Sequence, residues 1–99
     1  MRQIWVVDDD RSIRWVLEKA LTRAQMPFRL FESAADVVKA FERDTPSVLL
    51  SDIRMHDMSG LDLLAFVKNK YPGLPVIIMT AFSDLDSAVS AFQGGAYEY

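Results

Sequence analysis

Short strand-like segments alternate strictly with longer segments of helical periodicity, and this alternation most constrains the fold. The strand-like segments cover residues 3–7, 28–31, 48–50 and 75–80. Three of them, 3–7, 48–50 and 75–80, are continuously apolar, which is typical of strands that are buried on both faces of a sheet. Strands that alternate with helices form a parallel sheet with helices on both faces. The sequence therefore predicts one doubly wound α/β domain over residues 1–99.

Apolar side chains that recur every three or four residues predict a helix after each strand. The apolar positions are Ile13, Val16, Leu17, Ala20, Leu21 and Ala24 in the first helix and Val37, Val38 and Phe41 in the second. The first helix should end before Pro27, and Ser33 is the expected N-cap of the second. Pro72 and Gly73 should end the third helix, and the fourth is expected at 84–93.

Three consecutive aspartates, Asp8, Asp9 and Asp10, follow the first predicted strand, and Asp52 ends the third. Ligands of open parallel sheets bind beyond the carboxyl ends of the strands, where the strand order reverses. In the flavodoxin-like order 2-1-3-4-5 the first and third strands are neighbours there, so these carboxylates should crowd together. Crowded carboxylates raise one another's pKa unless a cation lies between them. An all-oxygen site of this kind, without His or Cys in the acidic segments, predicts Mg²⁺ and argues against zinc.

Thr80 is expected at the carboxyl end of the fourth strand, at the same edge of the sheet. A carboxylate, a metal and a hydroxyl that converge there can handle a phosphoryl group. The carboxylate would act as the nucleophile and form an acyl phosphate, while the metal and the hydroxyl hold the phosphoryl oxygens.

The motifs together resemble the receiver domain of two-component response regulators. The stretches "VVDDDRSIRWVL", "LLSDIRM" with Gly60 downstream, and "VIIMTA" carry the resemblance, which extends over nearly all 99 residues. It is strongest to the receivers of sigma-54-dependent transcription activators of nitrogen regulation. The resemblance implies a cytoplasmic signalling domain, not a classical enzyme, that a sensor histidine kinase phosphorylates. It also suggests an ATPase domain and a DNA-binding domain elsewhere in the full-length protein.

The resemblance also implies roles for individual residues of the acidic site. Asp52 is the implied phosphoacceptor and a metal ligand. Asp9 is implied as a direct Mg²⁺ ligand, Asp8 as a ligand through water, and the backbone carbonyl of Arg54 as a further ligand. Asp10 falls outside the acidic pair of the family, so we expect it to cap the following helix.

A second group of implied roles concerns the switch between two states. Thr80 would be the switch hydroxyl that moves toward the phosphoryl group, and Tyr99 the aromatic that changes position with it. The helix at 84–93 would then shift and favour an active face.

The sequence departs from the family pattern at two places. His56 stands where family members usually carry Pro, and we interpret it as a solvated loop residue. Receivers also continue into a fifth strand with a Lys and a last helix, and Tyr99 falls just before that Lys. We therefore expect a truncated receiver whose strand at 75–80 lies at an exposed edge, which favours a receiver homodimer.

The sequence also leaves other functions as alternatives. A degenerate receiver would act only as a protein-interaction module. An Asp-nucleophile phosphohydrolase would need a second Asp as general acid two residues after Asp52, where this chain has Arg54. The net charge of −3, without a basic block, gives no support for direct nucleic-acid binding. The apolar runs, such as 76–79, are too short to cross a membrane.

Overall fold

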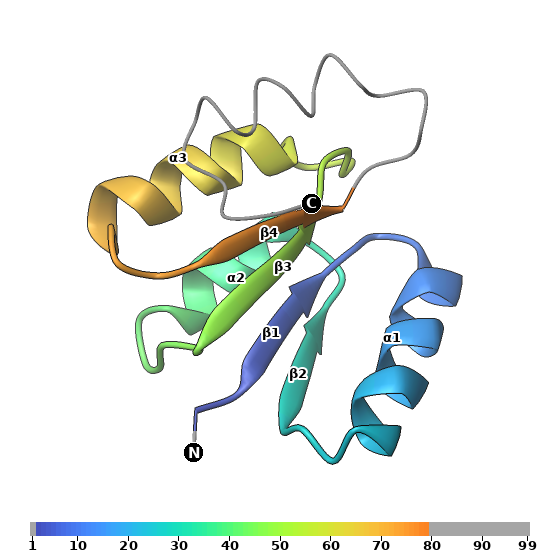
Figure 1. Ribbon diagram of the computed structural model, residues 1–99. Coiled ribbons are helices and arrows are strands. Elements are labelled where there is room, and N and C mark those ends of the chain that lie inside the picture. The colour runs from blue at the N-terminus through green and yellow to red at the C-terminus, as the bar shows by residue number, and fades with distance from the viewer. Residues whose placement is uncertain (1, 80–99) are drawn as a thin grey trace.

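The computed structural model describes residues 2–79, and these residues form the predicted alternation of strands and helices (Figure 1). The elements are β1 (Ile4–Val7), α1 (Arg11–Arg23), β2 (Phe28–Phe31), α2 (Ala34–Ala40), β3 (Val48–Asp52), α3 (Gly60–Lys70) and β4 (Val76–Met79). Thr80, the predicted helix at 84–93 and Tyr99 lie outside the described residues.

The four strands form one parallel sheet in the order β2-β1-β3-β4. This confirms the flavodoxin-like order for the strands that the structure describes. Val7 at the end of β1 pairs with Phe31 of β2 and with Ser51 of β3, while Asp52 pairs with Met79 of β4. The carboxyl ends of all four strands therefore lie along one edge of the sheet, where the sequence predicts the site.

The main hydrophobic core fills the face of the sheet that α2 and α3 cover. Trp5 and Val7 point into it, together with Val37 of α2 and Leu63 and Val67 of α3. The Trp5 ring packs against the rings of Phe31 and Phe41, with centroids 5.1 and 4.9 Å apart. Helix α1 lies on the opposite side of the sheet from α2 and α3 (Figure 1). The helices thus flank both faces, as the doubly wound architecture requires.

Helix α1 differs from its prediction in how much of its apolar side is covered. None of its residues is buried, and Ile13 and Val16 are 41% and 54% exposed. The half-buried positions include Arg14, Leu17 and Leu21, so the helix turns only one side of its apolar stripe toward the sheet. The 3.6-residue period had placed all the apolar residues on one stripe, but it could not tell which side of the stripe is covered.

Each helix within residues 2–79 begins at a side chain that accepts a hydrogen bond from its own first turn. Asp10, Ser33 and Ser59 accept from backbone N–H groups two or three residues later, at 2.8, 3.2 and 3.1 Å. These N-caps satisfy donors that have no partner inside the helix. The predicted capping roles of Asp10 and Ser33 are therefore confirmed. Within residues 2–79, no helix combines the length and the apolar character that a membrane crossing needs.

Candidate metal and phosphoacceptor site

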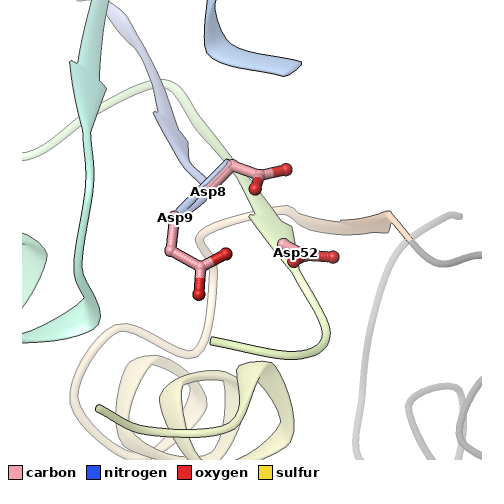
Figure 2. A group of neighbouring side chains, drawn as sticks. All are labelled: Asp8, Asp9 and Asp52. Atoms are coloured by element: carbon pink, nitrogen blue, oxygen red, sulfur yellow. The ribbon is translucent and has the colours of Figure 1, made fainter. Parts of the chain in front are cut away.

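Three of the predicted carboxylates meet at the carboxyl edge of the sheet. Asp8 and Asp9 follow β1, and Asp52 is the last residue of β3. Val7 pairs with Ser51 in the sheet. The residues that follow them, Asp8 and Asp52, therefore lie at the same level. One carboxylate oxygen from each of the three aspartates lies within 4.8 Å of the other two, and Figure 2 shows the group. The predicted convergence is confirmed.

Asp8 is the most enclosed of the three carboxylates, with only 3% of its surface exposed. Its Oδ1 accepts a hydrogen bond from the backbone N–H of Asp10 at 2.8 Å, and Nη1 of Arg14 donates to its backbone carbonyl at 2.6 Å. Burial raises the pKa of Asp8, the Asp10 N–H opposes this, and the charges of Asp9 and Asp10 add to the rise. The protein thus holds this carboxylate in place at an electrostatic cost that a cation would offset.

The pKa of Asp52 is raised as well. Burial and then the negative charge of Asp8 raise its pKa to about 6, against an ordinary value of 3.8. The rise persists although the backbone N–H groups of Ile53 and Arg54 donate to the carboxylate, the first at 2.9 Å. The expectation that these aspartates raise one another's pKa holds for Asp8 and Asp52.

The donor set fits a hard divalent cation. The ligand atoms are carboxylate oxygens from three residues on two strand ends, and Mg²⁺ prefers such oxygens while it keeps part of its water shell. The cluster contains no nitrogen or sulfur ligand. Zinc sites, by contrast, commonly contain His nitrogen or Cys sulfur ligands. The residues present therefore fit Mg²⁺, and the carbonyl of Arg54 stays a predicted ligand.

The sequence predicts that His56 is a solvated loop residue, but the structure also places it in contact with Asp9. Its backbone N–H donates to Oδ2 of Asp9 at 3.1 Å, and its ring Nδ1 lies 3.2 Å from the same oxygen. The ring is 71% exposed, so the prediction that it is solvated is confirmed. Its contact with Asp9, a predicted metal ligand, was not predicted.

The next residue ties the same loop to another helix. The Asp57 carboxylate accepts hydrogen bonds from the backbone N–H groups of Ala34 and Ala35, at 3.4 and 3.0 Å, at the start of α2. Partial burial raises the pKa of Asp57, but the hydrogen bonds from Ala35 and Ala34 outweigh it, so the pKa is lowered overall. The loop between β3 and α3 therefore contacts both Asp9 and α2.

Gly60 closes this loop against the end of β3. A Cβ at this position would overlap the backbone carbonyl oxygen of Asp52 and would lie 2.8 Å from Cα of Ile53. The Gly60 N–H also donates to the Ile53 carbonyl at 2.7 Å. The position therefore requires glycine for close backbone approach.

Sequence reasoning missed Arg14 and Asp57, for different reasons. Arg14 left a signal, since it is a charged residue within the apolar stripe of α1, and such a residue needs a polar partner there. Asp57 left none, because an aspartate in a loop with Met, Ser and Gly is ordinary. Met55 and Met58 of the same loop pack against the hydrophobic core.

The fold and the carboxylate cluster together define a receiver domain. The chain belongs to the response regulator receiver domain family, whose model matches residues 4–99. It is 65% identical over 96 residues to the DNA-binding transcriptional regulator NtrC of Proteus hauseri and 60% identical over 96 residues to NtrC of Escherichia coli strain K12. Each match covers 97% of this chain and 20% of the relative, so the chain spans about a fifth of the length of these curated relatives.

Solved structures give the same assignment. The apo receiver domain of Nitrogen Regulatory Protein C is 58% identical, with a TM-score of 0.86 over 99% of this chain and 79% of that chain. The BeF3-activated form of that receiver is 57% identical, with a TM-score of 0.82 over 100% of this chain and 82% of that chain. The predicted flavodoxin-like receiver fold is confirmed.

Proposed function

We propose that this receiver is a phosphorylation switch in which Asp52 accepts a phosphoryl group from a sensor histidine kinase in the presence of Mg²⁺. The observation that carries the proposal is the convergence of Asp8, Asp9 and Asp52 at one edge of the sheet. A carboxylate oxygen of Asp52 attacks phosphorus, the P–N bond of the kinase phosphohistidine breaks, and a P–O bond forms. The imidazole leaves and the product is an acyl phosphate.

The surrounding residues prepare Asp52 for this step. With a pKa of about 6, the carboxylate is largely ionised at neutral pH and is able to act as a nucleophile. Asp8 and Asp9 would hold Mg²⁺ together with Asp52 and the carbonyl of Arg54. When bound, Mg²⁺ supplies positive charge to the carboxylates and to the transferring oxygens. The hydrogen bonds from Ile53 and Arg54 orient the attacking group.

The switch itself involves residues beyond the described part of the chain. In our proposal the hydroxyl of Thr80 moves toward the phosphoryl group, Tyr99 follows, and the helix at 84–93 shifts. The similarity to a receiver solved in both an apo and a BeF3-activated form supports a two-state switch of this kind.

The response that the receiver controls is suggested by the relatives, which are named as DNA-binding transcriptional regulators. We propose that this receiver controls an NtrC-like, sigma-54-dependent activator of nitrogen regulation in the cytoplasm. An ATPase domain and a separate DNA-binding domain would then carry the response. The receiver would accept a phosphoryl group without acting as a classical enzyme. A receiver homodimer through the β4 side of the sheet is a further expectation.

The test is phosphorylation by acetyl phosphate with Mg²⁺, followed by intact mass spectrometry. We expect a phosphate-sized mass gain in the wild type and none in Asp52→Asn. Asp62→Asn removes an exposed carboxylate on α3 and is the matched control, which should be labelled like the wild type. Labelling of Asp52→Asn at the wild-type level would reject Asp52 as the site. A folded wild type that binds Mg²⁺ but takes no phosphate would favour the interaction-module alternative.

A further inference from the structure

We propose that His56 is a positioning residue for the cation: it holds the Asp9 carboxylate by one oxygen and leaves the other oxygen for the metal. The inference rests on the proposed function, since it concerns the same metal site. It deepens that function by adding a residue outside the carboxylate cluster.

Two donors of one residue meet the same oxygen of Asp9. The backbone N–H of His56 lies 3.1 Å and its ring Nδ1 3.2 Å from Oδ2. In the neutral ring, the tautomer with its proton on Nδ1 donates to this oxygen. Two donors on Oδ2 restrict rotation of the carboxylate, and Oδ1 has no competition from His56. Figure 2 shows the Asp9 side chain with one oxygen toward Asp8 and Asp52 and the other turned away.

The loop that carries His56 is itself held in place. Asp57, the next residue, accepts from the backbone N–H groups of Ala34 and Ala35 at the start of α2. On the other side, the Gly60 N–H donates to the Ile53 carbonyl at 2.7 Å. Because both sides of the loop are fixed, little conformational entropy is lost when His56 orients Asp9. The contact thus joins the end of β1 to the β3–α3 loop.

The same contact could instead compete with the metal. His56 would then keep the Asp9 carboxylate from binding the cation. The two effects differ in sign. If His56 positions Asp9, its removal weakens cation binding. If it competes, its removal strengthens binding. Groups that hold a metal ligand in place usually change metal affinity by about 10- to 100-fold, and we expect about fivefold here because the ring is exposed.

The test compares Mg²⁺ affinity, measured by titration calorimetry at one pH, in the wild type, His56→Ala and His56→Asn. We expect about a fivefold loss in His56→Ala and recovery of most of it in His56→Asn, whose short amide supplies an N–H near the place of Nδ1. Asn69→Ala is the control, because it removes an exposed polar side chain on α3. This variant should bind Mg²⁺ like the wild type. Recovery by Asn distinguishes a positioning role from a general loss of loop structure.

A second measurement is made without metal. In EDTA, the backbone amide resonance of residue 56 should shift and its hydrogen exchange should accelerate in Asp9→Asn relative to the wild type, because the charged acceptor is gone. Unchanged or tighter Mg²⁺ binding in His56→Ala, beside normal binding by the wild type, overturns the role of His56 and leaves the proposed function intact. A wild type that binds no Mg²⁺ overturns both.

Discussion

Gly60 lies against the backbone of Asp52 so closely that a Cβ at Gly60 would overlap the Asp52 carbonyl oxygen. The residue that begins α3 therefore touches the residue that ends β3. The loop between them leaves the sheet and contacts Asp9 and α2. It then returns to the end of β3. The position of the Asp52 backbone thus depends on the absence of a side chain eight residues later in the chain.

The first prediction concerns this contact. Gly60→Ala should lower the free energy of unfolding by about 2 kcal/mol or more, because the methyl group meets backbone that cannot give way. Urea denaturation measures the change. Gly73→Ala is the control, since a Cβ there meets no atom within 4 Å, and it should change stability by less than about 0.5 kcal/mol. Equal effects of the two substitutions would mean that the close approach at Gly60 is not rigid.

The raised pKa of Asp52 predicts how stability depends on pH. The folded protein binds a proton at Asp52 with a pKa of about 6, above the ordinary value of 3.8. The contribution of Asp52 to stability is therefore most favourable below the ordinary value and declines as the pH rises through the folded pKa. Asp52→Asn removes this dependence, so the variant should exceed the metal-free wild type by about 1–2 kcal/mol at pH 8 and by much less at pH 4.

Urea denaturation of both proteins in EDTA, from pH 4 to pH 8, measures that difference. Subtraction of the two curves removes the contributions of carboxylates that do not interact with Asp52, whereas its interaction with Asp8 remains part of the difference. A difference that is constant over the whole range would show that Asp52 has an ordinary pKa in the folded protein.

Mg²⁺ should stabilise the wild type by binding the folded state alone. At about 100 times the dissociation constant, the expected gain is about 2.7 kcal/mol, and excess EDTA should reverse it. Asp9→Asn and Asp52→Asn should lose most of this gain. Thermal unfolding with Mg²⁺, against NaCl at equal ionic strength, separates binding from general screening. If Asp62→Asn lost as much as the two site variants, the effect would be one of net charge.

Asp57→Asn should weaken the connection between the β3–α3 loop and α2. The amide keeps an acceptor but loses the charge, and we expect a loss of about 1 kcal/mol at pH 7 after allowance for solvent exposure. Because the pKa of Asp57 is lowered in the folded protein, its stabilisation is complete above the ordinary value of 3.8 and disappears as the pH falls through the folded pKa.

The difference between Asp57→Asn and the wild type should therefore be present at pH 7 and shrink in acid, which urea denaturation at both conditions tests. Glu42→Gln removes another exposed charge, just after the same helix, and serves as the control. A difference that grows in acid would contradict the lowered pKa.

The two tryptophans provide an optical test of the fold. Trp5 is fully buried, whereas Trp15 on α1 is 59% exposed. Trp15→Phe should therefore leave a blue-shifted emission that acrylamide quenches weakly, with little loss of stability. Trp5→Phe should leave a red-shifted, readily quenched emission. The reverse pattern would mean that α1 is turned toward the core.

Local patterns were sufficient to predict the elements and their order. Strand runs such as 48–50, the helical period and the caps at Asp10 and Ser33 each depend on neighbouring residues, so the sequence displays them directly. The cluster of Asp8, Asp9 and Asp52 followed as well, because strand ends in a parallel sheet meet at one edge.

The contacts that the sequence did not predict depend on the path of a loop through space. The contacts from His56 to Asp9 and from Asp57 to α2 join residues far apart in the chain, and no periodicity encodes where an irregular loop returns. The exposure of Ile13 and Val16 was missed for a related reason, since a helical stripe shows which residues share a side but not what covers them.

The register of β1 has a consequence for how this protein can evolve. Trp5 and Val7 face the core, and Val7 pairs with Ser51, which brings Asp8 level with Asp52. A slip of one residue would turn Trp5 and Val7 away from the core and at the same time separate the carboxylates. The stability of the core and the convergence of the carboxylates therefore depend on the same alignment. Substitutions of similar volume in β1 are open to drift, whereas an insertion or deletion there would remove both properties at once.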